Sequence, residues 1–408
     1  MYPLLTGLRI VECASFIAAP SCSLYLQQLG AEVIRVDPIG GGADFKRWPL
    51  SKGGDSYYWE GLNKGKKSVA IDLARPEGRQ LLTQLITAPG KDGGILVTNL
   101  PKEGFLSHER LSKHREDLIT VRVMGWGDGD SGFDYTVNAA LGVPFVTGSD
   151  ANGDAPVNHV LPAWDLLSGA YAAFATLAAE RNRLRTGRGG EVTVPLSDIA
   201  FSALANMGQI AEVMDTGDRP RYGNALYGAF GRDFRTSDGE RVMVAAITPK
   251  QWSGLVKSLD LVPTIQQIEK DLGVSFARDE GTRFTHRDTL FPIVERAIGA
   301  LTMDRVRTVF DENAVCWGPY FTLKRAIAEY PRLKPGAPLF DEIDHPSGHR
   351  YPAAGAAATF VGMDRERVQR APHLGEHTDE VLASVLSLSS ARIGELHASG
   401  LVASAPSN

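Results

Sequence analysis

Several patterns that define common classes of protein are missing from this chain of 408 residues. Its three cysteines, Cys13, Cys22 and Cys316, are too few and too widely spaced for a disulfide framework or a thiolate metal site. No apolar run approaches the ~20 residues of a membrane span. The first residues lack the basic segment and long apolar stretch of a signal peptide. We therefore expect a cytoplasmic protein with no membrane as a partner.

An excess of charge of one sign is also lacking. Lysine and arginine total 43 against 48 aspartates and glutamates, and the net charge of −5 offers no field that would hold a nucleic-acid backbone. The nine histidines show no metal-ligand spacing, since His373 and His377 lie four apart without a third ligand. The signatures HExxH and GxSxG are absent, as is GxGxxG after the first expected strand. No metal and no cofactor of the protein's own are expected.

Glycine is abundant by contrast. It accounts for 43 of 408 residues, about 10.5% against a usual ~7%. Glycine serves where a backbone turns tightly or approaches another group closely, so we expect many such places. The length and the hydrophobic share of 43% suffice for a large core and for more than one domain.

Short β-branched or apolar runs alternate with helical patterns in the first two hundred residues. We expect strands at 8–13, 32–36, 68–73, 94–100 and 119–126, and helices at 20–29 and 76–86. This alternation predicts a parallel α/β sheet of Rossmann-like type, and the ligands of such sheets bind at the C-terminal ends of the strands.

The second half of the chain follows a different pattern. A hairpin is expected around Asp238-Gly239, followed by a mainly helical stretch over 249–330. These features predict a smaller α+β domain. The expected organisation is a large domain over 1–220 and 326–408, with the small domain over 221–325 between its two parts.

Asp165 is the most informative carboxylate, because it stands at the N-terminus of a long alanine-rich helix expected over 165–184. One interpretation is an N-cap aspartate that binds the free N–H groups of the helix end. The other is a nucleophile with backbone donors nearby to bind an oxyanion. The segment GLNKGKKS (61–68) is equally open, since it fits either a basic turn before a strand or a patch for a ligand's phosphates.

Seven segments in order along the chain carry a family resemblance: PLLTGLRIVECASFIAAP, LGAEVIRVDP, NKGKKSVAIDLARPEGRQLL, VTNLPKEG, GFDYTVNAALG, RTGRGGEVTVPLSD and APHLGEHTDEVL. Together they resemble the class III CoA-transferases and racemases of the CaiB–BaiF type. The resemblance implies an interlocked homodimer, a large Rossmann-like domain that binds CoA, and an acyl-CoA substrate. It also implies that Asp165 attacks the acyl-CoA thioester, giving an aspartyl anhydride and then an aspartyl-CoA thioester.

The resemblance further implies contacts with the substrate. CoA contacts fall on Ile17, Ala18, Ile71, Asn99, Leu100 and Pro101. Pro38 stands where some members place an arginine against the adenine, so that contact is expected to differ here. Arg47 is a candidate for pairing with a free carboxylate of the substrate, and is otherwise a surface arginine. Gly228 belongs to GNALYGAFG (223–231), which matches the family's loop over the intermediate and otherwise fits an interdomain linker.

The family contains both transferases and racemases, and Phe133 separates them. The segment GFDYT places Phe133 where the racemases have a histidine, and a phenylalanine cannot move a proton. Among the transferases, the chain most resembles members that move CoA between the two carboxyl groups of mesaconyl-CoA in carbon fixation by the 3-hydroxypropionate bi-cycle. The alternatives are an intermolecular transferase using succinyl-CoA and another dicarboxylate and, less favoured, a racemase or a non-catalytic acyl-CoA-binding protein.

Overall fold

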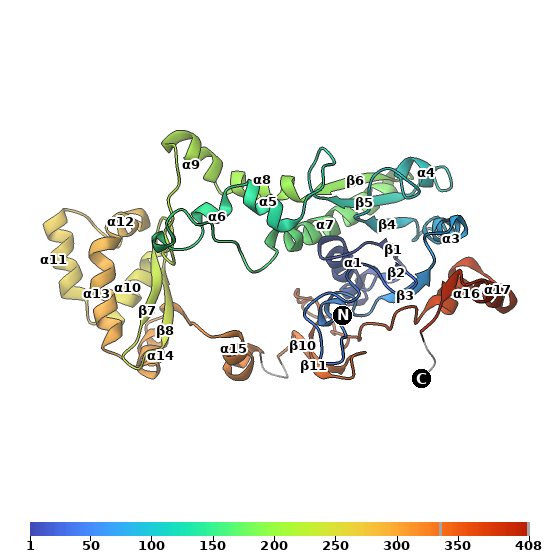
Figure 1. Ribbon diagram of the computed structural model, residues 1–408. Coiled ribbons are helices and arrows are strands. Elements are labelled where there is room, and N and C mark those ends of the chain that lie inside the picture. The colour runs from blue at the N-terminus through green and yellow to red at the C-terminus, as the bar shows by residue number, and fades with distance from the viewer. Residues whose placement is uncertain (334–336, 406–408) are drawn as a thin grey trace. The chain divides into compact units, whose positions relative to one another are not determined.

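The computed structural model describes residues 1–333 and 337–405 of the chain (Figure 1). Its contacts group the chain into two units. The first comprises Met1–Leu141, His159–Ala211 and Pro331–Asn408, and the second Gly142–Asn158 and Glu212–Tyr330. Residues 334–336 and 406–408, which belong to the predicted C-terminal part of the large domain, lie outside the described residues.

The first unit is built on a seven-stranded sheet with the order β12-β3-β2-β1-β4-β5-β6. All neighbours pair in parallel except β12, which is antiparallel to β3. The order from β3 to β6 is that of a Rossmann-like fold, so the predicted α/β class is confirmed. The strands are β1 (Arg9–Cys13), β2 (Glu32–Pro38), β3 (Lys67–Ile71), β4 (Ile95–Thr98), β5 (Ile119–Met124), β6 (Gly190–Pro195) and β12 (Val402–Ala403).

Helices cover both faces of this sheet, which is why its central strands are apolar on both sides. Successive residues point to opposite faces, so Ile10 belongs to one buried cluster and Val11 to the other. The first cluster contains residues of α1 (Ala18–Gln28) and α7 (Ala163–Thr186), and the second of α3 (Pro76–Ile86), α16 (Thr378–Leu386) and α17 (Ser390–Ala398). Figure 1 shows α7 running along β5 and β6.

Shorter elements complete the first unit. Its helices include α2 (Tyr57–Leu62), α4 (His108–Ser112), α5 (Asp134–Ala140) and α8 (Leu196–Asn206), with 3₁₀ turns η1 (Pro3–Leu5) and η3 (Pro331–Leu333). A separate two-stranded antiparallel ribbon joins β10 (Phe340–Asp344) to β11 (Arg350–Ala354). Within the described ranges, no helix combines the length and the apolar character needed to cross a membrane.

The second unit is a three-stranded antiparallel sheet packed against helices. Its strands follow the order β7-β8-β9, and the hairpin between β7 and β8 confirms the expected turn at Asp238-Gly239. The strands are β7 (Phe230–Arg235), β8 (Arg241–Ala246) and β9 (Cys316–Pro319). The helices are α6 (Val143–Val146), α10 (Pro249–Ser258), α11 (Val262–Leu272), α12 (Glu280–Thr285), α13 (Arg287–Gly299), α14 (Met303–Glu312) and α15 (Leu323–Glu329), with η2 (Asp150–Asn152) and most of α9 (Gln209–Thr216).

Three segments expected in the large domain group with the second unit instead: 142–158, 212–220 and 326–330. Residues Gly142–Asn158 belong to the second unit. The reason is Arg221, a buried residue whose guanidinium donates hydrogen bonds to the carbonyls of Phe145 (2.7 Å) and Ala155 (2.7 Å). A guanidinium that satisfies several backbone carbonyls fixes a segment otherwise poor in regular structure, and this contact spans too many residues for local patterning to reveal.

Gly169 allows α7 to lie against α1. A Cβ at this position would lie 2.7 Å from the carbonyl oxygen of Ala18 and 2.8 Å from the Cβ of Ser21. The close approach therefore requires glycine in the second turn of α7. As a result, the helix that begins just before Asp165 is seated directly on the N-terminal turn of α1.

We predict that Gly169→Ala destabilises the protein by about 1–3 kcal/mol, because the added methyl group would push the two helices apart. Gly394 in α17 is the matched control, since a Cβ there meets open space and Gly394→Ala should stabilise by about 0.5–1 kcal/mol through helix propensity. Urea unfolding followed by circular dichroism measures both effects. Equal effects of the two substitutions would contradict the close-approach explanation.

Candidate active site

The C-terminal ends of β1 and β4 meet where the strand order reverses, which is where ligands of this fold bind. Ile17 and Ala18 form the start of α1 directly after β1, and Asn99 follows β4. The side chain of Asn99 ties the two loops together, because its amide oxygen accepts from the Ser15 N–H (3.1 Å) and its amide nitrogen donates to the Ser15 carbonyl (2.8 Å). Five of the six predicted CoA-contacting residues therefore lie on two loops at one edge of the sheet.

Arg122 fixes the second of these loops and was not among the sequence candidates. Its guanidinium is buried under the loop and donates to the carbonyls of Leu100 (2.6 Å) and Pro101 (3.1 Å), while Glu191 balances its charge at 2.9 Å. An arginine inside a strand gives no sequence signal for this role. The hydrogen bonds leave these two carbonyls engaged with the protein, so a ligand would meet other atoms of the loop.

Ile71 lies apart from the other predicted contacts. It is the last residue of β3, pairs with Pro38 of β2, and its side chain is 0% exposed within the core. Burial leaves this side chain no surface for a ligand.

The segment 61–68 serves the fold through two of its lysines. The ammonium group of Lys66 is buried and donates to Glu12 (2.8 Å), and Lys67 pairs with Glu32 (2.6 Å) and Glu380 (2.8 Å). Lysines already paired with carboxylates have little capacity left for phosphate oxygens. These contacts favour the basic-turn interpretation of the segment.

The N-cap interpretation of Asp165 is wrong, because α7 starts earlier than the sequence pattern indicated. The helix begins at Ala163, so Asp165 lies inside its first turn. The free N–H groups of Trp164 (2.7 Å) and Asp165 (3.1 Å) both donate to one oxygen of Asp134. Asp134 thus satisfies the helix end in place of Asp165, and its other oxygen binds Nε2 of His159 at 2.6 Å. The sequence reasoning missed both Asp134 and His159.

The carboxylate of Asp165 is therefore left available for chemistry. It accepts no hydrogen bond from any residue in the described part of the chain, and it is half-buried. Burial raises the pKa of Asp165 to about 7, the charge of Asp134 adds to this rise, and Arg47 opposes it. A carboxylate with a raised pKa and no structural bonds is more basic and more reactive than a solvated one.

Arg47 lies within electrostatic reach of Asp165, as a substrate-binding role would require. Its guanidinium packs over the rings of Phe16 (5.2 Å) and Tyr58 (5.4 Å). Cation–π contacts hold an arginine in place without using its N–H donors. The N–H donors of the Arg47 guanidinium can therefore still pair with a carboxylate.

A buried ionic cluster holds the residues around Arg47. Arg35 is 0% exposed and binds Asp44 (2.8 Å), Glu12 (3.1 Å) and Asp37 (2.8 Å). The second oxygen of Asp44 accepts from the backbone N–H of Phe16 (3.1 Å), whose φ of +68° is a left-handed conformation that side chains rarely adopt. The cluster thus fixes a strained residue whose ring contacts Arg47.

Gly228 lies in the second unit, in the loop that precedes β7. Its φ of +75° suits glycine.

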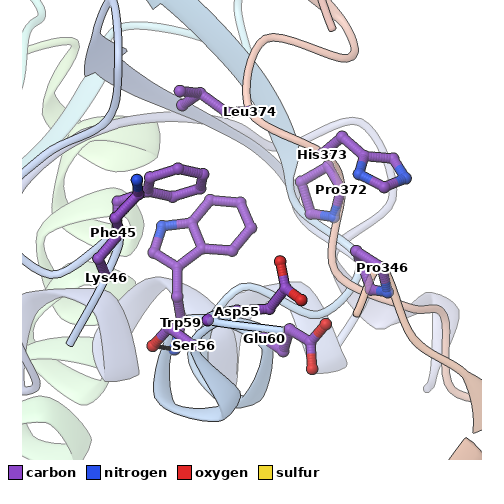
Figure 2. Close-up of a pocket in the computed structure, with 11 residues that line it drawn as sticks. Phe45, Lys46, Asp55, Ser56, Trp59, Glu60, Pro346, Pro372, His373 and Leu374 are labelled. Atoms are coloured by element: carbon purple, nitrogen blue, oxygen red, sulfur yellow. Dashed lines mark hydrogen bonds between the residues drawn. The ribbon is translucent and has the colours of Figure 1, made fainter. Parts of the chain in front are cut away.

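A small cavity lies beside this region of the first unit but is not the reaction centre (Figure 2). Trp59 and Phe45 contact each other edge to face at 5.2 Å in its wall, with Pro346, Pro372 and His373 along another part of the lining. Its volume of about 100 Å³ is well below the ~300–1,000 Å³ of typical ligand sites. Neither Asp165 nor Arg47 lines it.

The family of the chain follows from comparison with known proteins. The model of CoA-transferase family III matches residues 5–378, and the chain belongs to this family. It is 48% identical over 406 residues to a 2-methylfumaryl-CoA isomerase of Chloroflexus aurantiacus, across 99% of this chain and 98% of that relative. It is 28% identical to a human succinyl-CoA:glutarate CoA-transferase, across 98% and 90% of the two chains. The crystal structure of a CaiB/BaiF family protein from Brucella suis has a TM-score of 0.75 and 25% identity, covering 93% of this chain and 99% of that one.

The raised pKa of Asp165 predicts a stability that depends on pH. The folded-state pKa of about 7 exceeds the ordinary value of 3.8, so the native state loses stability as pH rises from about 4 through 7 and bears the full cost of the ionised group above that range. Asp165→Asn should therefore be more stable than the wild type at pH 8, on the order of 2 kcal/mol after allowing for partial exposure.

Thermal unfolding between pH 4 and 8 measures this difference, which should disappear toward pH 4. A constant difference across that range would contradict an elevated pKa. Asp198 is the matched control, because it occupies the same position in the first turn of α8 but is exposed.

Proposed function

We propose that this protein is a 2-methylfumaryl-CoA (mesaconyl-CoA) isomerase that moves CoA from the C1 to the C4 carboxyl group of one substrate molecule. The carboxylate of Asp165 carries this proposal, since Asp134 caps the helix and leaves Asp165 free beside a cation. The similarity to the Chloroflexus isomerase over nearly the whole chain supports the choice of acyl group.

The chemistry requires only carboxylates and the thiol of CoA. Asp165 attacks the C1 thioester carbonyl and expels CoA as a thiolate, leaving a mixed anhydride. The thiolate then attacks the aspartyl carbonyl, which releases the diacid and forms an aspartyl-CoA thioester. The C4 carboxylate of the same diacid attacks this thioester, expels the thiolate and forms a second mixed anhydride. The thiolate finally attacks the C4 carbonyl, which gives the product thioester and releases Asp165 as a carboxylate. Each step exchanges one activated acyl group for another of similar energy, as covalent catalysis allows.

Arg47 explains why the substrate should be a dicarboxylic acid. While one carboxyl group is joined to Asp165, the other is a free carboxylate that needs a cation. We propose that Arg47 is this cation, because it is held beside Asp165 with its N–H donors free of the two aromatic contacts. Retaining the free end would keep the diacid in the site while its two ends exchange.

We propose an interlocked homodimer that acts in the cytoplasm within the 3-hydroxypropionate bi-cycle, with CoA of the substrate as the only coenzyme. We further propose that CoA lies along the loops after β1 and β4, and that the loop containing Gly228 covers the intermediate.

Asp165→Ala should abolish isomerisation, with a loss of about 10⁴-fold or more for removal of a covalent nucleophile. Chromatographic separation of the C1 and C4 thioesters measures the activity. Asp198→Ala provides the control, because Asp198 occupies the same position in the first turn of α8. Turnover retained in Asp165→Ala would exclude the covalent mechanism.

A second measurement separates isomerisation from transfer between molecules. Isotopically labelled free mesaconate is added during turnover, and the product thioester is analysed by mass spectrometry. Intramolecular transfer predicts little label in the product. Rapid incorporation would instead indicate an intermolecular transferase, the activity of the human relative that uses succinyl-CoA and glutarate.

A further inference from the structure

The reaction creates negative charge on the oxygen of Asp165 itself. When a thiolate or a carboxylate attacks the aspartyl carbonyl, its π electrons move onto that oxygen and form a tetrahedral oxyanion. Hydrogen-bond donors placed at such an oxygen are among the largest contributions to catalysis. A helix N-terminus would normally supply them, but the N–H groups of Trp164 and Asp165 already donate to Asp134. The oxyanion therefore needs a donor from elsewhere.

The hydroxyl of Tyr58 is a donor without a structural role. Its oxygen is buried and makes no hydrogen bond to any residue in 1–333 or 337–405. A buried hydroxyl with no partner costs free energy, so its presence calls for an explanation. Burial raises the pKa of Tyr58. Arg47 opposes this rise, and the charges of Asp44 and then Asp165 add to it. The hydroxyl thus stays protonated and lies within electrostatic reach of Asp165.

The surroundings of Tyr58 fix the position of its ring. Tyr58 belongs to α2, whose N-cap Ser56 accepts from the N–H of Trp59 at 3.0 Å and donates to the carbonyl of Arg47. The guanidinium of Arg47 lies 5.4 Å from the centre of the Tyr58 ring. The same short segment therefore holds a cation and a neutral donor, and both lie within electrostatic reach of Asp165.

We propose that the Tyr58 hydroxyl donates a hydrogen bond to the oxyanion formed on Asp165 when CoA thiolate or substrate carboxylate attacks the aspartyl carbonyl. In the first of these steps the C–S bond forms and the pair of π electrons moves to the Asp165 oxygen. The pair then returns, the bond to the acyloxy group breaks, and the diacid leaves as a carboxylate. Tyr58 keeps its proton throughout, so no acid or base is consumed. This inference rests on the proposed aspartyl intermediates.

Tyr58→Phe tests the proposal, with Tyr57→Phe as the matched control. Both substitutions remove one hydroxyl from adjacent residues of α2, but the ring of Tyr57 packs on Tyr351 at 5.6 Å. Tyr58→Phe should lower kcat by about 10²-fold with little change in KM, whereas Tyr57→Phe should keep nearly full activity. Because the lost hydroxyl has no partner, Tyr58→Phe should melt no lower than the wild type. Equal losses of activity in both variants, or a lower melting temperature for Tyr58→Phe, would overturn the proposal.

The species that accumulates gives an independent readout. Attack of Asp165 on the substrate places the oxyanion on the substrate oxygen, so this first step should be less affected by Tyr58→Phe. The variant should then accumulate the anhydride, and acid quenching within the first turnover should release more free CoA thiol per active site than in the wild type. A rise in KM without accumulation of CoA would show that Tyr58 binds the substrate instead, and would overturn the proposal.

The two proposals fail in different ways. If the wild type does not turn over 2-methylfumaryl-CoA, the proposed substrate is wrong. Tyr58 can still be tested with succinyl-CoA, once mass spectrometry detects a covalent acyl or CoA adduct on Asp165. If the wild type is active and Tyr58→Phe is equally active, only the role of Tyr58 is lost.

Discussion

The carboxylate of Asp134 determines what the candidate site can do. By accepting the N–H groups of Trp164 and Asp165 with one oxygen, it satisfies the end of α7 that Asp165 would otherwise have to cap. The side chain of Asp165 is thereby released, and its pKa rises through burial and through the nearby charge of Asp134. The same bonds occupy the backbone N–H donors of Trp164 and Asp165 at the helix end.

A second constraint comes from charge buried below the site. Removing Arg35 and its three carboxylate partners from water is costly, and only their mutual pairing offsets the cost. Because Asp44 is paired with Arg35, its carboxylate is fixed in place and accepts the N–H of Phe16, whose backbone is strained. Phe16 and Tyr58 then hold Arg47 between two rings. The free carboxylate of Asp165 and the position of Arg47 thus depend on different buried acidic groups, Asp134 for the first and the partners of Arg35 for the second.

The sequence predicted those features that follow from local pattern. Pro76 and the leucine stripe behind it defined α3 to the residue, and the apolar runs located the strands, because periodicity and helix ends are encoded within a few residues. It could not predict that Asp134 caps α7, since that contact joins residues 30 and 31 positions apart. The same applies to Arg122 and Arg221, whose bonds to distant carbonyls leave no trace in periodicity.

The contact at Gly169 limits how this enzyme could be redesigned. One turn of helix separates this glycine from Asp165, and it lies against the first residue of α1 with no side chain between. The crossing between α7, which carries Asp165, and α1 is therefore already as close as the two backbones allow. Space for a larger acyl group would have to come from smaller side chains around Arg47, because the two helices cannot approach more closely at Gly169.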